Sequence, residues 1–181
     1  DFVAPEASGL GDYIGGFVVT AGAEEEDISA RFARANDDYS SILAKALADR
    51  FAEAFAERMH ERVRREFWAY APEEDLSGEQ ILAETYRGIR PAPGYPSQPD
   101  HAGRLARVRL LGGGGRVGVT LTESLAVWPG ASVSGLYLAD PGGHCFGVAK
   151  VGRDQGEDYA GRKRMSVSEV ERWLAPILNY D

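Results

Sequence analysis

The chain has 181 residues, of which 44% are hydrophobic and 27% are charged, so it can bury one sizeable core. Its 20 Lys and Arg against 28 Asp and Glu give a net charge of −8, which argues against a nucleic-acid-binding protein. One cysteine excludes an internal disulfide framework and a multi-cysteine zinc site, and no apolar run approaches the ~20 residues of a membrane span. We therefore expect an acidic soluble domain of a reducing compartment, the cytoplasm, with no membrane association.

The N-terminal third predicts one strand and a long helical region. Residues 1–5 contain neither an initiating methionine nor the basic stretch of a signal peptide, so we expect the sequence to start inside a longer chain. Residues 12–20 are rich in aromatic and β-branched side chains and predict a strand. From residue 24 to about residue 68 the pattern is helical, with a break near residues 36–38. Apolar side chains recur there every four residues and predict a stripe that faces the core: Leu43, Leu47, Phe51, Phe55, Met59, Val63 and Phe67.

The middle of the chain predicts a second helix and then a stiff loop. Ser77 and Gln80 form a capping-box pattern, and we expect this helix to end at Gly88. Four prolines between residues 91 and 99 exclude a helix or a central strand there. A short helix is expected over residues 102–111, and the glycines at 112–115 are expected to stop it and form a flexible connector.

The last third predicts strands followed by helices. Strands are expected at residues 117–121, 132–139 and 144–151, with the last two joined as a hairpin by a turn at 140–143. Two helices follow, over residues 155–164 and after the cap Ser166. Because the strands cluster between helical blocks without regular alternation, we expect an α+β fold.

Most familiar catalytic and metal-binding patterns are missing. The glycine run lacks the Gly-Lys-Ser/Thr of a phosphate loop, and no G-x-S-x-G nucleophile motif occurs. His60, His101, His144 and Cys145 are the only soft metal ligands, and adjacent His144 and Cys145 would point to opposite faces of a strand. A hydrogen-bonded loop histidine at 101 and a buried structural thiol at 145 are therefore favoured over a metal site or a nucleophile.

Two patterns remain as candidates for function. Asp49, Glu53, Glu57 and Glu61 follow one another at four-residue steps, which indicates either a solvated helix face or an acidic docking ridge. The stiff loop at 90–96 combines Arg90, which can grip a carboxylate, with Gly94 and with the ring face of Tyr95. Glu84 lies six residues earlier and could receive an amine or position Arg90. These groups suit a zwitterionic amino acid joined to an aromatic base, although a purely structural loop is an open alternative.

The loop Arg-Pro-Ala-Pro-Gly-Tyr-Pro at 90–96 resembles the RxxxGYP signature of the S-adenosylmethionine-binding activation domain of cobalamin-dependent methionine synthase. The resemblance extends in the same order over essentially the whole chain. It includes Tyr13-Ile14-Gly15, Asp37-Asp38-Tyr39, His60-Glu61-Arg62-Val63-Arg64, Leu121-Thr122-Glu123-Ser124 and Glu171-Arg172-Trp173-Leu174.

The resemblance implies an α+β unit over residues 1–181, with a twisted antiparallel sheet flanked by helices and without the family's N-terminal segment. Such a domain binds S-adenosylmethionine and docks on the cobalamin-binding domain of the same enzyme. There the oxidised cofactor is reactivated with an electron from flavodoxin or a flavoprotein reductase and a methyl group from S-adenosylmethionine. The whole enzyme methylates homocysteine in methionine biosynthesis, whereas the isolated domain is not expected to be catalytic.

The resemblance also implies roles for individual residues. Arg90 would bind the ligand carboxylate, and the loop backbone at Ala92 and Gly94 would meet the adenosine. Pro91 would also belong to the ligand site, and Tyr95 would lie beside the ligand, facing the cobalamin. Glu84 matches an acidic residue near the same site, and Asp49 and Glu53 match an acidic pair that faces the cobalamin domain. Cys145 and Phe146 stand where the family commonly has an aromatic pair containing a tyrosine, so one hydrogen bond to the ligand would be lost.

Two other functions are considered. The chain could be a docking module for the cobalamin domain or flavodoxin that has little ligand affinity of its own, as Cys145 and the missing segment suggest. An independent small-molecule methyltransferase is disfavoured because no G-x-G-x-x-G pattern opens a helix. Replacing Arg90 by alanine separates the S-adenosylmethionine-binding reactivation domain from the docking module. In the first case the replacement should abolish ligand binding, and in the second case docking should persist.

Overall fold

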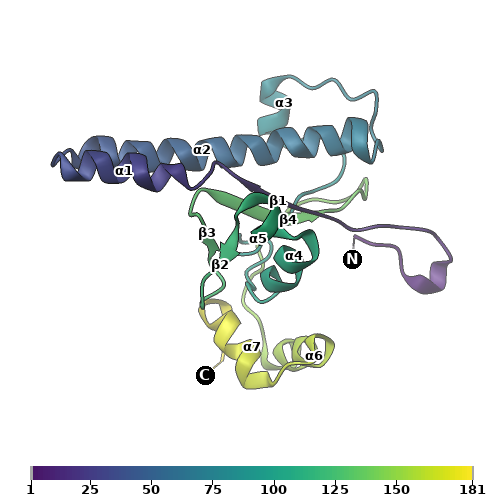
Figure 1. Ribbon diagram of the computed structural model, residues 1–181. Helices are drawn as coiled ribbons and strands as arrows, with labels where there is room; N and C mark the ends of the chain where they lie inside the picture. The colour runs from purple at the N-terminus through teal and green to yellow at the C-terminus, as the bar shows by residue number, and fades with distance from the viewer. Residues whose placement is uncertain (1, 181) are drawn as a thin grey trace.

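The structure, a computed structural model, describes residues 2–180 and combines helices with short antiparallel strands, which confirms the predicted α+β class. In Figure 1 the long helix α2 lies across one side of the strands β1 and β4, with α1 and α3 next to it, and the helices α4 to α7 lie on the other side. The elements in chain order are β1 (Gly15–Thr20), α1 (Glu24–Arg34), α2 (Asp38–Arg62), α3 (Gly78–Leu82), α4 (Arg104–Leu111), α5 (Gly113–Val117), β2 (Thr120–Leu121), β3 (Val127–Trp128), β4 (Ser132–Tyr137), α6 (Arg153–Lys163) and α7 (Val167–Leu174). Short 3₁₀ turns lie at Glu6–Ser8 and Ala175–Ile177, and a π-helical turn at Val63–Phe67 continues α2.

The central sheet pairs the two ends of the predicted β region. β1 and β4 run antiparallel, from Gly15 opposite Tyr137 to Thr20 opposite Ser132. The other edge of β4 receives the chain at residues 89–91, because the Leu136 amide donates to the Pro91 carbonyl at 2.9 Å. The loop at residues 90–96, called the GYP loop below, is thereby fixed to the sheet at its N-terminal end.

The predicted hairpin between residues 132–139 and 144–151 is wrong. The turn exists, since the Gly143 amide donates to the Asp140 carbonyl at 3.1 Å, but residues 144–150 form no strand. Both edges of β4 are already occupied, one by β1 and one by residues 89–91. The returning chain instead crosses the loop, where the Val148 amide donates to the Pro96 carbonyl at 2.8 Å.

The long helix contacts the sheet through small side chains. Ala48, Ala52, Ala56 and His60 form its buried row, and Ala52 and Ala56 pack in the core with side chains of the sheet that include Phe17, Val19, Val133 and Tyr137. Small side chains let the helix axis approach the sheet closely. None of the helices within residues 2–180 combines the length and the apolar character needed to cross a lipid bilayer.

The predicted apolar stripe of α2 is only partly correct. Met59 and Val63 reach the core, but the other five members of the stripe are exposed, Phe51 to 69%: Leu43, Leu47, Phe51, Phe55 and Phe67. The alanine row lies one residue further along the chain, and it faces the sheet in place of the large side chains. A row with a four-residue step drifts around a 3.6-residue helix, which explains why only Met59 and Val63 of this row turn inward.

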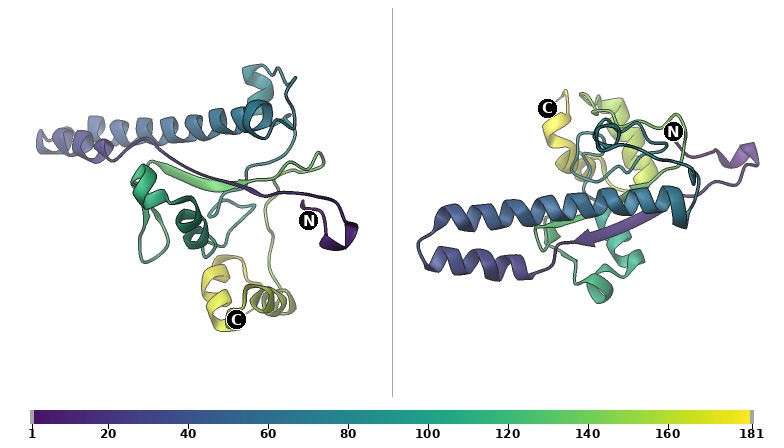
Figure 2. Two further views of the ribbon diagram at one scale, coloured as in Figure 1. Left: turned by 45° about the vertical axis from the view of Figure 1, so that its right-hand side comes forward. Right: turned by 90° about the horizontal axis from the view of Figure 1, so that it is seen from above.

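The predicted break in the helical region is confirmed. Asn36 adopts a left-handed φ of 56°, and the Asp37 side chain accepts from the Ser40 amide at 3.0 Å to cap α2. The chain therefore turns back, and α1 and α2 lie side by side as an antiparallel pair that extends beyond the sheet (Figure 2).

Other boundaries differ from the predictions. The Ser77 cap is present, but α3 ends at Leu82 rather than at Gly88, because Glu84 has a left-handed φ of 52°. The glycine run is no flexible connector, since Gly113–Val117 forms the short helix α5. The helix predicted at 102–111 is confirmed as α4, and the strand predicted at 117–121 shortens to β2.

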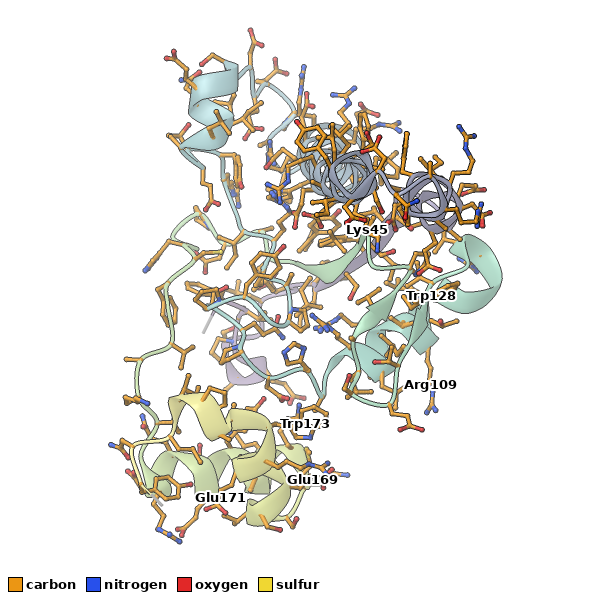
Figure 3. All side chains as sticks on the ribbon, turned by 90° about the vertical axis from the view of Figure 1, so that its left-hand side faces the viewer. Lys45, Arg109, Trp128, Glu169, Glu171 and Trp173 are labelled. Carbon is orange, nitrogen blue, oxygen red and sulfur yellow. The ribbon has the colours of Figure 1, made fainter. Side chains whose placement is uncertain are left out.

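The two C-terminal helices are confirmed as α6 and α7, and Ser166 caps α7. They form their own small core around Ala160, Val170 and Leu174. Figure 3 shows Glu169 and Trp173 of this pair at the opposite end of the molecule from Lys45 of α2. Asp100 joins the pair to the GYP loop, because its carboxylate accepts from Tyr159 Oη and Lys163 Nζ, both at 2.6 Å.

Candidate functional site

A cavity of about 300 Å³ lies between the GYP loop, the sheet and residues 145–147. This volume is at the lower end of the range that small-molecule sites occupy. Seven of the eight residues predicted to bind a ligand line it, and Gly94 is the exception. The seven are Glu84, Arg90, Pro91, Ala92, Tyr95, Cys145 and Phe146. Glu53, predicted for docking, lines the same cavity, whereas Asp49 lies one turn earlier on α2 and pairs with Arg50 at 2.8 Å.

The loop that forms one wall is rigid because its backbone is held at several points. Ala92 is buried, and the Gly94 amide donates to the Gln98 carbonyl at 2.8 Å. Gly94 has a φ of +93°, and a Cβ there would lie 2.8 Å from Cε1 of His101, so only glycine fits without strain. The Arg104 guanidinium donates to the Pro93 carbonyl and, at 2.9 Å, to the Leu125 carbonyl.

Arg90 enters the cavity from this wall. Its Nη1 donates to Oε2 of Glu57 at 2.8 Å and to the Tyr86 hydroxyl at 3.3 Å. Burial acts to lower the pKa of Arg90, but Glu57 and Tyr86 outweigh it and hold the pKa above its ordinary value. Within residues 2–180 no hydrogen bond reaches Nε or Nη2 of Arg90. These two nitrogens form the edge on which a guanidinium binds a carboxylate with two parallel hydrogen bonds.

Tyr95 and Glu53 meet at the side of the cavity nearest α2. The Tyr95 hydroxyl donates to the Glu53 carboxylate. Burial, together with this hydrogen bond, raises the pKa of Tyr95 to about 12, so the phenol stays protonated at neutral pH. The acidic row of α2 is therefore not a uniformly solvated face, because Glu53 and Glu57 both bind residues of the loop.

Beneath the cavity lies a buried cluster built on His60 and Arg64, which are both fully buried. The His60 ring stacks on Tyr137 with centroids 5.3 Å apart, and its Nε2 lies 3.3 Å from the Tyr70 hydroxyl. Burial and the nearby charges of Arg64 and Arg90 lower the pKa of His60 to about 2, so the imidazole is neutral at physiological pH. His60 is a core histidine.

The other soft ligands do not gather around a metal. Within the part of the chain that the structure describes, no group of three or more His, Cys, Asp or Glu side chains could hold a metal ion. Asp100 takes part in hydrogen bonds, but Nδ1 of His101 is buried without a partner, so the predicted hydrogen-bonded loop histidine is wrong at that atom. His144 packs its ring against Phe2 and Phe146.

The prediction that Cys145 is a buried structural thiol is also wrong. The thiol was expected in a buried strand, but the residue is exposed and lines the cavity, because residues 144–150 cross the loop instead of pairing with β4. Partial burial of the sulfur and the negative charge of Glu84 raise the pKa of Cys145. The thiol is therefore mostly protonated at neutral pH and a weak nucleophile.

Comparison with known proteins agrees with this geometry. The family model for the activation domain of vitamin B12 dependent methionine synthase matches residues 1–164. The chain belongs to this family. A solved structure described as the MetH reactivation domain bound to AdoHcy is 57% identical in sequence, with a TM-score of 0.95. The match covers 99% of this chain and 55% of that one, so the chain spans about half the length of the solved protein.

In this member of the activation-domain family, the sequence did not predict the two residues that bind Arg90, Tyr86 and Glu57. Tyr86 lines the cavity and shares Arg90 with Glu57. Glu57 was noted only as one member of the acidic row. A signal for both existed, since Tyr86 precedes Arg90 by four residues and Glu57 follows Glu53 by one helical turn. The pattern alone did not show that α2 crosses this loop.

Proposed function

We propose that this chain is the S-adenosylmethionine-binding part of the reactivation domain of a cobalamin-dependent methionine synthase, and that the cavity beside the GYP loop holds the ligand. The observation that carries the proposal is that Arg90, whose Nε and Nη2 bind nothing within residues 2–180, lines a cavity formed by the family's signature loop. The solved relative, described as bound to AdoHcy, supports this choice of ligand.

The lining residues suggest how the ligand would lie. The edge of Arg90 would take the carboxylate of the amino-acid moiety, and the acidic Glu84 would face its amine. Pro91 and Ala92 would contact the adenosine, and Gly94 would let the loop backbone approach it. The aromatic faces of Tyr95 and Phe146 would flank the sulfonium, a cation that aromatic rings attract.

The residues of this chain would contribute position rather than acid–base chemistry. Tyr95 keeps its proton at neutral pH, and Arg90 keeps its charge, so neither exchanges a proton with the ligand. Cobalamin, held by the partner domain, would supply the reduced cobalt atom that accepts the methyl group. Holding the methyl donor in line with that acceptor converts an encounter of two molecules into a reaction within one complex.

The docking surface would lie on α2 next to the cavity. Glu53 and Asp49 are one turn apart, and Glu53 itself lines the cavity and accepts from the Tyr95 hydroxyl. We propose that this acidic pair faces the cobalamin-binding domain. The family resemblance supports flavodoxin or a flavoprotein reductase as electron donor, and a cytoplasmic enzyme that methylates homocysteine as the parent protein.

A docking module with little ligand affinity is the second candidate. Cys145 offers the ligand a weaker hydrogen bond than a tyrosine would, which favours weak binding over tight binding.

The two candidates are separated by calorimetric titration of the chain with S-adenosylmethionine and with S-adenosylhomocysteine. The variant Arg90→Ala should lower the affinity for both ligands by about tenfold to a hundredfold, because a charge-assisted hydrogen bond to the ligand carboxylate is lost. Arg109→Ala is the matched control, since Arg109 lies on α4 and does not line the cavity (Figure 3). Absence of binding up to millimolar ligand would contradict the proposal and favour the docking module.

A further inference from the structure

Glu57 occupies a special place in the acidic row of α2. Its Oε2 accepts from Nη1 of Arg90 at 2.8 Å, and its Oε1 lies 3.9 Å from Nη1 of Arg64. The side chain is 26% exposed and does not line the cavity itself. Glu57 therefore lies behind Arg90, between this cation and the buried cluster.

Arg64 lies on the other side of Glu57 and attracts it as an ion pair at 3.9 Å, without a hydrogen bond. The Arg64 side chain is fully buried, its Nε donates to Glu74 at 2.7 Å, and its guanidinium stacks over the ring of Tyr86 at 4.2 Å. Because Arg64 is buried and held by these two contacts, it has little freedom to move with Glu57. The carboxylate of Glu57 thus lies between two cations: Arg90, to which it is hydrogen-bonded, and Arg64, which attracts it at longer range.

The way in which Glu57 holds Arg90 leaves one edge of the guanidinium free. Glu57 and Tyr86 both bind Nη1, whereas the two hydrogens on Nε and Nη2 point in one direction and bind nothing within residues 2–180. An unheld arginine side chain would lose considerable rotamer entropy when it orders around a ligand. A side chain that is already held avoids this cost.

We infer that Glu57 is the positioning residue of this site: it holds Arg90 by Nη1, backed by Arg64, and so presents the Nε and Nη2 edge to the carboxylate of the ligand. This inference rests on the proposed function. It opposes the simplest electrostatic expectation, in which Glu57 competes with the ligand carboxylate for Arg90 and its removal tightens binding.

The test uses two ligands that differ in the carboxylate. S-adenosylhomocysteine carries the amino-acid moiety, and 5′-deoxy-5′-methylthioadenosine has the same adenosine and thioether without it. The affinity of S-adenosylhomocysteine should fall slightly in Glu57→Gln, which keeps an acceptor oxygen, and about tenfold in Glu57→Ala. The affinity of methylthioadenosine should stay at the wild-type value in both variants, which also verifies that the cavity has folded.

Glu61→Gln is the matched control. Glu61 is the next member of the same row, and it pairs with Arg58 and Arg65 on the helix surface instead of with Arg90. Its replacement should leave the affinity of both ligands unchanged. Unchanged or tighter binding of S-adenosylhomocysteine by Glu57→Ala would overturn the inference and support the competitor role.

A second readout needs no ligand. The Nε–H nitrogen-15 NMR signal of Arg90 can be assigned by its loss in Arg90→Ala. In the wild-type chain its chemical shift should differ from that of a free arginine, and in Glu57→Ala it should move to the free-arginine value. If this signal does not change, Glu57 does not hold Arg90 and the inference is wrong. If the wild-type chain fails to bind S-adenosylhomocysteine, the proposed function fails, and the role of Glu57 toward a ligand fails with it.

Discussion

The buried imidazole of His60 should make the stability of this domain depend on pH in a range where most of its carboxyl groups do not titrate. In the unfolded chain a histidine binds a proton near pH 6.5. In the folded chain burial, with Arg64 and Arg90 nearby, lowers the pKa of His60 to about 2. The folded state thus binds fewer protons below pH 6.5, so acidification stabilises the unfolded state.

The size of the effect follows from these two pKa values. Between pH 7 and pH 5 an unfolded histidine becomes almost fully protonated while folded His60 stays neutral, which lowers the free energy of unfolding by about 2 kcal/mol. The loss continues at about 1.4 kcal/mol per pH unit until the pH approaches the folded pKa. His101, whose pKa is also lowered by burial and by Arg104, adds to the loss in the same direction.

The assay is urea unfolding at several pH values between 7 and 5. His60→Phe keeps an aromatic ring against Tyr137 but binds no proton, so its stability should fall by about 2 kcal/mol less than that of the wild type over this range. His144→Gln, at an exposed position, is the control and should keep most of the wild-type pH dependence. Equal pH dependence of wild type and His60→Phe would refute the argument.

Two further predictions test the packing. Phe51→Ser should change the free energy of unfolding by less than about 0.5 kcal/mol, because Phe51 is exposed, whereas Ala52→Leu should cost about 1–3 kcal/mol in the buried row. The opposite order in urea unfolding would mean that the other face of α2 meets the sheet. Asp100→Asn should cost about 1–3 kcal/mol by weakening the bonds to Tyr159 and Lys163. Amide hydrogen exchange in this variant should then be faster in α6 and α7 but not in α2. Unchanged exchange rates in α6 and α7 would show that Asp100 does not hold these helices to the rest of the domain.

Local chemistry explains which parts of the fold were predictable. The Ser77 and Ser166 caps, the break before α2 and the stiff loop at 90–96 each depend on residues within a few positions of one another. Strand 15–20 was predictable from its composition. These features do not depend on the rest of the molecule.

The errors come from competition between distant segments. Residues 144–151 have a strand-like composition, but residues 89–91 bind the edge of β4 that a hairpin would use. In the same way, α2 carries a large apolar row and an alanine row one residue apart, and the sheet accepts the alanines. The sequence is compatible with either arrangement in both cases, and only the packing of the folded chain decides which one forms.

The site shows the same division. The loop residues and Glu84 could be singled out from their chemistry and from the family resemblance, and the structure brings them around one cavity with Cys145 and Phe146. The contact of Glu57 with Arg90 joins residues 33 positions apart and needs the crossing of α2 over the loop. No spacing in the sequence encodes that contact.

The claim that the cavity beside the GYP loop is the ligand site has a direct test, because the only cysteine of the chain lines it. We would measure the rate of Cys145 alkylation by iodoacetamide at mildly alkaline pH, with and without saturating S-adenosylhomocysteine. The ligand should slow alkylation several-fold, and methionine at the same concentration should not. Binding detected by calorimetry with no change in the alkylation rate would place the ligand elsewhere and contradict the account.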